Sequence, residues 1–126
     1  MICIYALDTR QYTNNIRAAR THWAVPYVEF LIMSYSATKS REFGWKTRLV
    51  TDRYGAELMA EFGMSSLYDE ILIELDDIDV KPRFWAAGKI HAYTKSIKDF
   101  GDGFIMCDND AGFRQKPPEW VTDSQY

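Results

Sequence analysis

Two carboxylates stand two positions apart at the end of an apolar run. Phe104 to Cys107 is a short apolar stretch, and Asp108, Asn109 and Asp110 follow it directly. Residues two apart in an extended segment point the same way, so Asp108 and Asp110 can converge on one point. Two hard oxygen ligands suit Mg²⁺ or Mn²⁺, which also bind phosphate oxygens. The alternative interpretation is an Asx turn, formed by Asp and Asn where a strand ends.

The elements that would position these residues alternate between strand and helix. Short apolar runs predict strands, and helical periodicity with Pro, Asp and Gly at the boundaries predicts the helices between them. Strands that alternate with helices of this length imply right-handed crossovers and a mainly parallel α/β sheet. The expected strands cover 2–7, 47–51, 71–75 and 104–107, and the expected helices cover 27–42, the segment from Asp52 to Gly63, and the segment from Pro82 to Gly101.

Two of these helices carry apolar residues at helical spacing. In the first, the apolar positions occupy a wide arc, so we expect this helix to be substantially buried. Its arc includes Tyr27, Phe30, Leu31, Ile32 and Tyr35. In the helix that Pro82 opens, one face is formed by Ala86, Ile90, Tyr93 and Ile97.

A polar cluster follows each expected strand. In parallel α/β sheets, ligands bind beyond the carboxyl ends of the strands, so we expect the four clusters to gather at one edge. Asp52 is also a suitable N-cap for the helix that follows it. The clusters are Asp8-Thr9-Arg10, Thr51-Asp52-Arg53, Asp76-Asp77 and Asp108-Asn109-Asp110.

Bulk composition narrows the class of protein. At 126 residues the chain has the size of one domain, and its net charge of −3 gives no reason to expect binding to nucleic acid or an anionic membrane. No apolar run approaches membrane-spanning length, and we expect a cytoplasmic location. Cys3 and Cys107 both lie in apolar strand-like runs, which indicates buried free thiols rather than a disulfide framework.

A family resemblance covers about residues 22–113. The segments EFLIMSYSATKSREFGWKTRLVTDRYGAELM, YDEILIEL, FWAAGKIHAY and GFIMCDND occur in this order and at similar spacing in a family of bacterial glycosyltransferase-like proteins. The chain thus resembles the nucleotide-binding half of a GT-A-fold glycosyltransferase. The resemblance implies a Rossmann-like sheet in the order 3-2-1-4, a nucleotide-sugar-binding domain over 1–113, and an irregular tail over 114–126.

The resemblance also implies how a nucleoside diphosphate or nucleotide sugar would be held. In such enzymes the DxD motif ends the fourth strand and holds a metal ion on the diphosphate. Asp110 would be the main ligand to Mn²⁺ or Mg²⁺, and Asp108 would bind the metal or the ribose. Lys89 would reach from its helix toward the diphosphate or the sugar, with a solvated lysine as the alternative.

The nucleobase would lie over the first two strands. The resemblance implies that Asp52 lies near the base and that Tyr5 and Ala6 line the base pocket. An N-cap is the favoured alternative role for Asp52, and a place in the core is the alternative for Tyr5. A receiver-like or phosphatase-like module, with Asp8 as its essential carboxylate, is a further and less favoured class.

The chain departs from the GT-A pattern after the DxD motif. About sixteen residues follow Asp110 and contain no His, whereas GT-A transferases continue much further and complete an acceptor site. We therefore expect a hexosyltransferase-type donor site without its acceptor half. The chain would be a fragment, a short form that acts with a partner, or a non-catalytic binding or structural module.

The same strand order predicts an open edge. The first two crossover helices would cover one face of the sheet, and the crossover that leads to strand 104–107 would pass over the other. One helix cannot cover that face, and the last strand would be an apolar edge. We therefore expect a homodimer, or a partner chain, to cover this strand near Trp85, Phe113 and Trp120.

Overall fold

The computed structural model describes residues 1–10, 26–79, 86–109 and 111–120. Three residues to which the sequence assigned a role, Pro82, Trp85 and Asp110, lie outside these residues. The strand expected over 71–75 begins and ends slightly earlier than its apolar run suggested. In chain order the elements are β1 (Ile2–Leu7), α2 (Pro26–Glu42), β2 (Lys46–Thr51), α3 (Arg53–Glu61), a 3₁₀ turn (Ser65–Leu67), β3 (Glu70–Ile73), α4 (Ala87–Phe100) and β4 (Phe104–Cys107).

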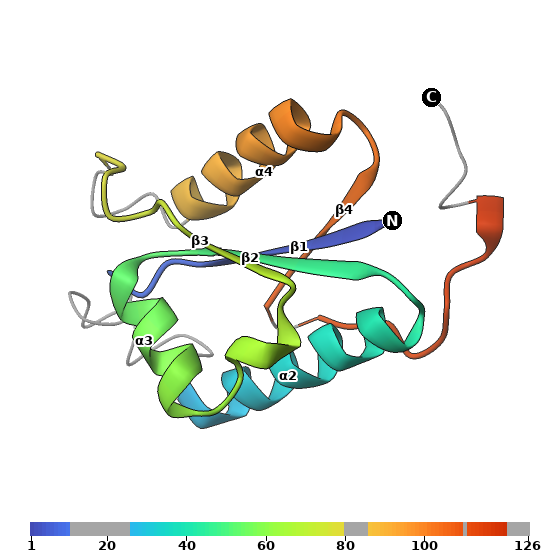
Figure 1. The fold of residues 1–126 in the computed structure, drawn as a ribbon, viewed down its shortest axis with the longest axis horizontal. Coiled ribbons are helices and arrows are strands. Elements are labelled where there is room, and N and C mark those ends of the chain that lie inside the picture. The colour runs from blue at the N-terminus through green and yellow to red at the C-terminus, as the bar shows by residue number, and fades with distance from the viewer. Residues whose placement is uncertain (11–25, 80–85, 110, 121–126) are drawn as a thin grey trace.

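The strands form a four-stranded parallel sheet in the order β3-β2-β1-β4 (Figure 1). Ile2 of β1 stands opposite Lys46 on one side and Phe104 on the other. Thr51 at the end of β2 stands opposite Ile73. This arrangement confirms the expected α/β fold and its order 3-2-1-4, and it brings the carboxyl ends of the strands to one edge.

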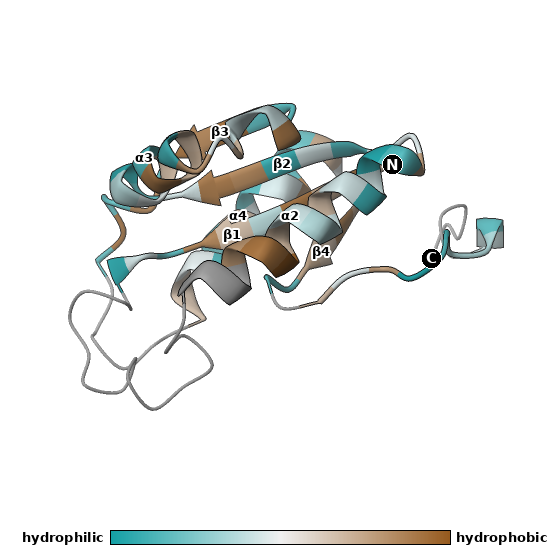
Figure 2. Cartoon of the chain, turned by 90° about the horizontal axis from the view of Figure 1, so that it is seen from below, coloured by the Kyte–Doolittle hydropathy of each residue, from teal (hydrophilic) through white to brown (hydrophobic). Residues whose placement is uncertain are grey.

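Helices cover both faces of the sheet. Helices α2 and α3 lie on one face and α4 lies on the other, as the strand order predicted (Figure 1). Successive residues of β1 alternate between the two cores: Tyr5 and Leu7 pack toward α2, and Ile4 and Ala6 pack toward α4. Hydrophobic residues predominate in the strands, whereas the helices contain both hydrophilic and hydrophobic residues (Figure 2).

Helix α2 is less buried than its apolar arc predicted. Phe30 and Met33 are buried, but Leu31 is 69% exposed and Tyr35 is 49% exposed. The expectation that this arc is substantially buried therefore holds at Phe30 and fails at Leu31 and Tyr35, and the side chain of Tyr27 lies outside the described residues. The hydrophobic pattern could not show which apolar residues of α2 face the sheet, because the face of α2 that meets the sheet also contains the small polar residues Ser36 and Ser40.

Two of these polar residues serve the core. The Tyr5 hydroxyl lies 2.9 Å from Ser36 Oγ and 3.0 Å from Ser40 Oγ, and all three residues are fully buried. A buried hydroxyl without such partners would cost stability. The serines of α2 therefore allow β1 to place a tyrosine, rather than a phenylalanine, under the helix.

Helix α4 packs on the sheet through small side chains. An added Cβ at Gly88 would stand 3.1 Å from Leu75 Cδ1 and 3.1 Å from Asp8 Cβ, so the helix approaches the sheet closely. The face predicted from Ile90, Tyr93 and Ile97 exists, but each of these residues is about half exposed, at 51%, 50% and 45%. The buried residues of α4 are Ala87, Gly88, Ala92 and Ser96.

A buried arginine joins the sheet to α4. Arg48 is 6% exposed, and its guanidinium contacts Glu70 Oε2 at 2.6 Å and Asp99 Oδ2 at 2.6 Å. The same group lies 4.3 Å from the centre of the Phe100 ring, within cation–π range. The hydrogen bond from Arg48 also lowers the pKa of Asp99.

The segment after β4 runs back beside α2. Phe113 packs edge-to-face against Trp45, with ring centres 5.4 Å apart, and also contacts Phe43. Trp120 is 71% exposed. Within the described residues, this segment adds no strand to the sheet, so β4 keeps an outer edge. No helix in the described ranges has the length and apolar character needed to cross a membrane.

Candidate functional site

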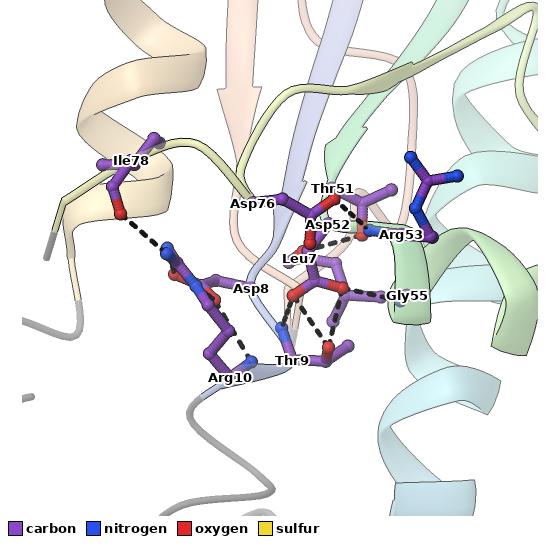
Figure 3. A network of polar contacts seen from close by, with 10 residues as sticks. All are labelled: Leu7, Asp8, Thr9, Arg10, Thr51, Asp52, Arg53, Gly55, Asp76 and Ile78. Atoms are coloured by element: carbon purple, nitrogen blue, oxygen red, sulfur yellow. Dashed lines mark hydrogen bonds and ion pairs between the residues drawn. The ribbon is translucent and has the colours of Figure 1, made fainter.

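Hydrogen bonds connect the carboxyl ends of the strands. The residues after β1 contact those after β2, those after β2 contact the loop after β3, and those after β4 contact the end of β1. Figure 3 shows the first two of these connections as one network. The edge that the sequence predicted is therefore a connected set of polar groups.

Asp52 is the centre of the network. Its carboxylate accepts hydrogen bonds from Thr9 N at 2.6 Å and Gly55 N at 2.7 Å, and Thr9 Oγ1 contacts both of its oxygens at 2.7 Å. Asp52 is 1% exposed and is the N-cap of α3, which confirms the predicted cap. Because protein donors already occupy both oxygens, contact between Asp52 and a nucleobase would require Thr9 to move.

Close packing fixes the same corner. Thr51 Oγ1 donates to Leu7 O at 2.8 Å, and an added Cβ at Gly55 would stand only 2.1 Å from that hydroxyl oxygen. Position 55 therefore requires glycine. Thr9 and Gly55 were not predicted as partners of Asp52. No local sequence pattern could predict the contact between Thr9 and Asp52, because the two residues stand 43 positions apart along the chain.

An arginine links β1 to the loop after β3. Arg10 Nε and Nη2 contact the two oxygens of Asp8 at 2.8 and 2.7 Å, and Nη1 donates to Ile78 O at 2.8 Å. The hydrogen bond with Asp8 raises the pKa of Arg10. Asp76 holds the neighbouring loop by accepting from Arg53 N at 2.9 Å (Figure 3). Asp8 is therefore half of an ion pair, which disfavours it as the single essential carboxylate of a receiver-like module.

The residues after β4 contact both α4 and β1. Asp108 forms an ion pair with Lys89, which lies in the first turn of α4, and the side chains are 55% and 39% exposed. Asn109 Nδ2 donates to Ala6 O at 2.7 Å. Asn109 Oδ1 is buried and has no hydrogen-bond partner within the described residues. The structure thus brings Lys89, which the resemblance assigned to the diphosphate or the sugar, next to Asp108, which it assigned to the metal or the ribose, and both lie near the end of β1, which it assigned to the base pocket.

The remaining predicted site residues lie farther from solvent. Tyr5 is fully buried among Ser36, Ser40 and the core under α2. The carbonyl oxygen of Ala6 accepts the hydrogen bond from Asn109, and the side chain of Ala6 packs in the core on the α4 face. The placement of Tyr5 matches the alternative role in the core that the sequence left open.

At the carboxyl edge of the sheet, two of the described carboxylates, Asp8 and Asp108, are paired with a cation and are not grouped with other metal-ligating side chains. Among residues 1–10, 26–79, 86–109 and 111–120, no group of three or more His, Cys, Asp or Glu side chains could hold a metal ion. Asp110 lies outside these ranges. Within the described residues, Asp108 is the carboxylate of the DxD motif that is exposed at the edge, and a metal there would need Asp110 or ligand oxygens to complete its shell.

The N-terminus of α4 lies beside the ion pair of Lys89 and Asp108. Its N-cap is Ala86, no described side chain caps it by a hydrogen bond, and its first turn contains no acidic residue. The helix dipole makes such an end favourable for phosphate. Lys89 stands in this turn, so a cationic group and the helix terminus lie beside Asp108.

Together the fold and the edge define a Rossmann-like parallel α/β protein with paired acidic and basic groups beyond its strand ends. The chain belongs to the family described as "Family of unknown function (DUF6734)", whose model matches residues 2–125. Comparison with curated proteins and with solved structures found no match.

Proposed function

We propose that this chain binds the diphosphate of a nucleoside diphosphate or nucleotide sugar at the carboxyl edge of the sheet, together with Mn²⁺ or Mg²⁺. The observation that carries the proposal is the pairing of Lys89 with Asp108 at the start of α4, which no described side chain caps. Asp108 and Asp110 would hold the metal, and Lys89 would exchange its carboxylate partner for a phosphate oxygen. The metal would neutralise the diphosphate.

The reaction that such diphosphate binding would serve is glycosyl transfer. In that reaction a nucleoside diphosphate leaves the sugar, and a cationic site stabilises the charge that develops on it. The parallel sheet with a DxD sequence after its fourth strand supports this class. Asn109, whose Oδ1 has no partner within the described residues, offers an acceptor for a ligand hydroxyl beside the same strand end.

Calorimetry with UDP, GDP and ADP tests the proposal. With MnCl₂ present, we expect at least one of these diphosphates to bind about tenfold or more tightly than without it, a change of about 1.4 kcal/mol. Asp110→Ala should remove the effect of Mn²⁺, because it deletes a metal ligand. Lys89→Ala should weaken binding both with and without the metal.

Lys98→Ala is the matched control for Lys89→Ala. Lys98 is an exposed lysine in the last turn of the same helix, so its removal should leave diphosphate affinity unchanged. Equal affinities with and without Mn²⁺ for the unaltered chain would leave the DND sequence as an ordinary turn and would refute the proposed metal site.

A second role, assembly, is favoured by the surface beside β4. The α4 flank next to this edge strand exposes Ile90, Tyr93 and Ile97, and Tyr93 contacts the Phe104 ring at 5.6 Å. Strand β4 itself contains no charged residue. An apolar edge without charges is open to pairing with another strand.

The opposite edge is protected. Glu74, which follows β3, lies 3.0 Å from His91 Nε2 and 3.9 Å from Lys95 Nζ on the other flank of α4. Glu70 on β3 pairs with Arg48. Because charged groups discourage strand addition at β3, the two edges differ in their capacity to associate.

We infer that a second copy of the chain pairs along β4 and covers the exposed α4 flank. Light scattering of the purified chain at micromolar concentrations should therefore give a dimer. The double variant Ile90→Glu/Ile97→Glu should give a monomer, because it places charges on the covered surface. Leu31→Glu, which alters an exposed apolar residue on α2, should remain dimeric. A monomer for the unaltered chain would contradict the inference.

A further inference from the structure

Two thiols that are far apart in sequence meet in the core. Cys3 on β1 and Cys107 on β4 are separated by 104 positions, and their Sγ atoms lie 2.7 Å apart. A disulfide holds two sulfur atoms at about 2.05 Å. The sequence contains 2 cysteines, so each has the other as its sole possible intrachain partner.

The register of the strands decides how a bond between them would behave. Cys3 stands opposite Ile105, and Cys107 stands opposite Tyr5, so the cysteines are diagonal neighbours on the α2 face. On adjacent parallel strands, such neighbours are offset by about 4.8 Å across the sheet and about 6.6 Å along it, so their Cα atoms lie about 8 Å apart, whereas disulfides usually span about 4.4 to 6.8 Å. A bond would therefore draw β4 toward β1 and would be easier to reduce than a relaxed structural disulfide.

We propose that Cys3 and Cys107 form a reversible intrachain disulfide when the protein meets a hydroperoxide. The Cys3 thiolate attacks one peroxide oxygen, the O–O bond breaks, and a sulfenic acid forms while the second oxygen leaves as water. The Cys107 sulfur then attacks the sulfenic sulfur, which forms the S–S bond and releases the other oxygen as water. The two thiols together lose two electrons, which reduce hydrogen peroxide to two waters.

The surroundings support this order of events. The hydrogen bond with Cys107 lowers the pKa of the Cys3 thiol, against the effect of burial. Cys3 is fully buried and Cys107 is 7% exposed on the edge strand. Within the described sheet of one chain, β4 pairs with β1 alone, so local opening of this edge in the monomer gives a small peroxide access to both sulfur atoms.

The disulfide would fix the strand that leads into the candidate site. Cys107 is the last residue of β4 and immediately precedes Asp108. Oxidation would therefore tie the position of that carboxylate to β1. The strand register and the contact between the two sulfur atoms do not depend on nucleotide binding, so the disulfide can form whether or not the chain binds a nucleotide.

Intact-mass measurement of the purified chain tests the proposal. After treatment with hydrogen peroxide, unfolding and incubation with N-ethylmaleimide, we expect a chain that has lost the mass of two hydrogens and has gained no maleimide. Peptide mapping should show the segments containing Cys3 and Cys107 linked within one chain. Dithiothreitol added to the folded, oxidised protein should restore two reactive thiols.

Cys107→Ser provides the control. This variant should retain Cys3 as a thiol, or as a sulfenic acid that dimedone captures, and should form no intrachain link. Two maleimide groups on the peroxide-treated unaltered chain, or links formed between chains alone, would refute the disulfide. A bond that resists dithiothreitol in the folded protein would refute its reversibility, and the unaltered chain decides both points without any variant.

Discussion

Replacing Asp52 with alanine should lower the free energy of unfolding by about 3 to 5 kcal/mol. The change removes the N-cap of α3 and leaves the backbone N–H groups of Thr9 and Gly55 buried without an acceptor. The Thr9 hydroxyl loses its partner as well. Urea unfolding followed by circular dichroism measures the loss.

Asp76→Ala is the matched control. Asp76 also accepts one backbone N–H, from Arg53, but it lies at the exposed end of the network. Water can replace the lost acceptor there, so we expect a loss below about 1 kcal/mol. Equal losses for the two variants would contradict the central position assigned to Asp52.

Arg48→Ala should destabilise the protein by about 2 to 4 kcal/mol, because it deletes a long side chain that is buried against Phe100. The change leaves Glu70 and Asp99 without their shared cation and removes the guanidinium from the Phe100 ring. Helix α4 then loses a polar connection to β2. Urea unfolding again provides the measurement.

Arg48→Met separates packing from charge. Methionine keeps an unbranched side chain against Phe100 but cannot pair with either carboxylate. Water can solvate the exposed carboxylates of Glu70 and Asp99 in both variants, and methionine fills the space that alanine leaves empty, so we expect Arg48→Met to be more stable than Arg48→Ala. The reverse order would mean that packing at Phe100 contributes little.

The architecture was predictable from sequence because the strand signals were continuous. The run from Ile2 to Leu7 alternates into two cores, which is why it lacks the apolar–polar alternation of a one-sided strand. Helix faces were less predictable. The spacing of Ile90, Tyr93 and Ile97 identified a real face of α4, but spacing cannot tell whether a face meets the sheet or solvent. Close approach at Gly88 selected the small-residue face instead.

The position of the candidate site in the fold was predictable from the sequence, but the hydrogen bonds between its residues were not. Parallel strands bring their carboxyl ends to one edge, so the polar clusters after β1, β2 and β4 could be assigned to it. The sequence could not show that Asp52 is held by Thr9, because that contact depends on the register between β1 and β2. It also could not show that the side chain of Tyr5 points into the core, where Ser36 and Ser40 bind its hydroxyl.

The pairing of β1 with β4 also sets the order in which the protein can fold during synthesis. Residues near the start of the chain pair with residues about a hundred positions later: Ile2 stands opposite Phe104 and Tyr5 opposite Cys107. Strands β1, β2 and β3 can assemble earlier, but the edge of β1 that pairs with β4 stays exposed until β4 leaves the ribosome. Such distant pairing slows folding and prolongs exposure of an apolar strand. A nascent chain of this protein is therefore most prone to misassociation in the interval just before residue 107 emerges.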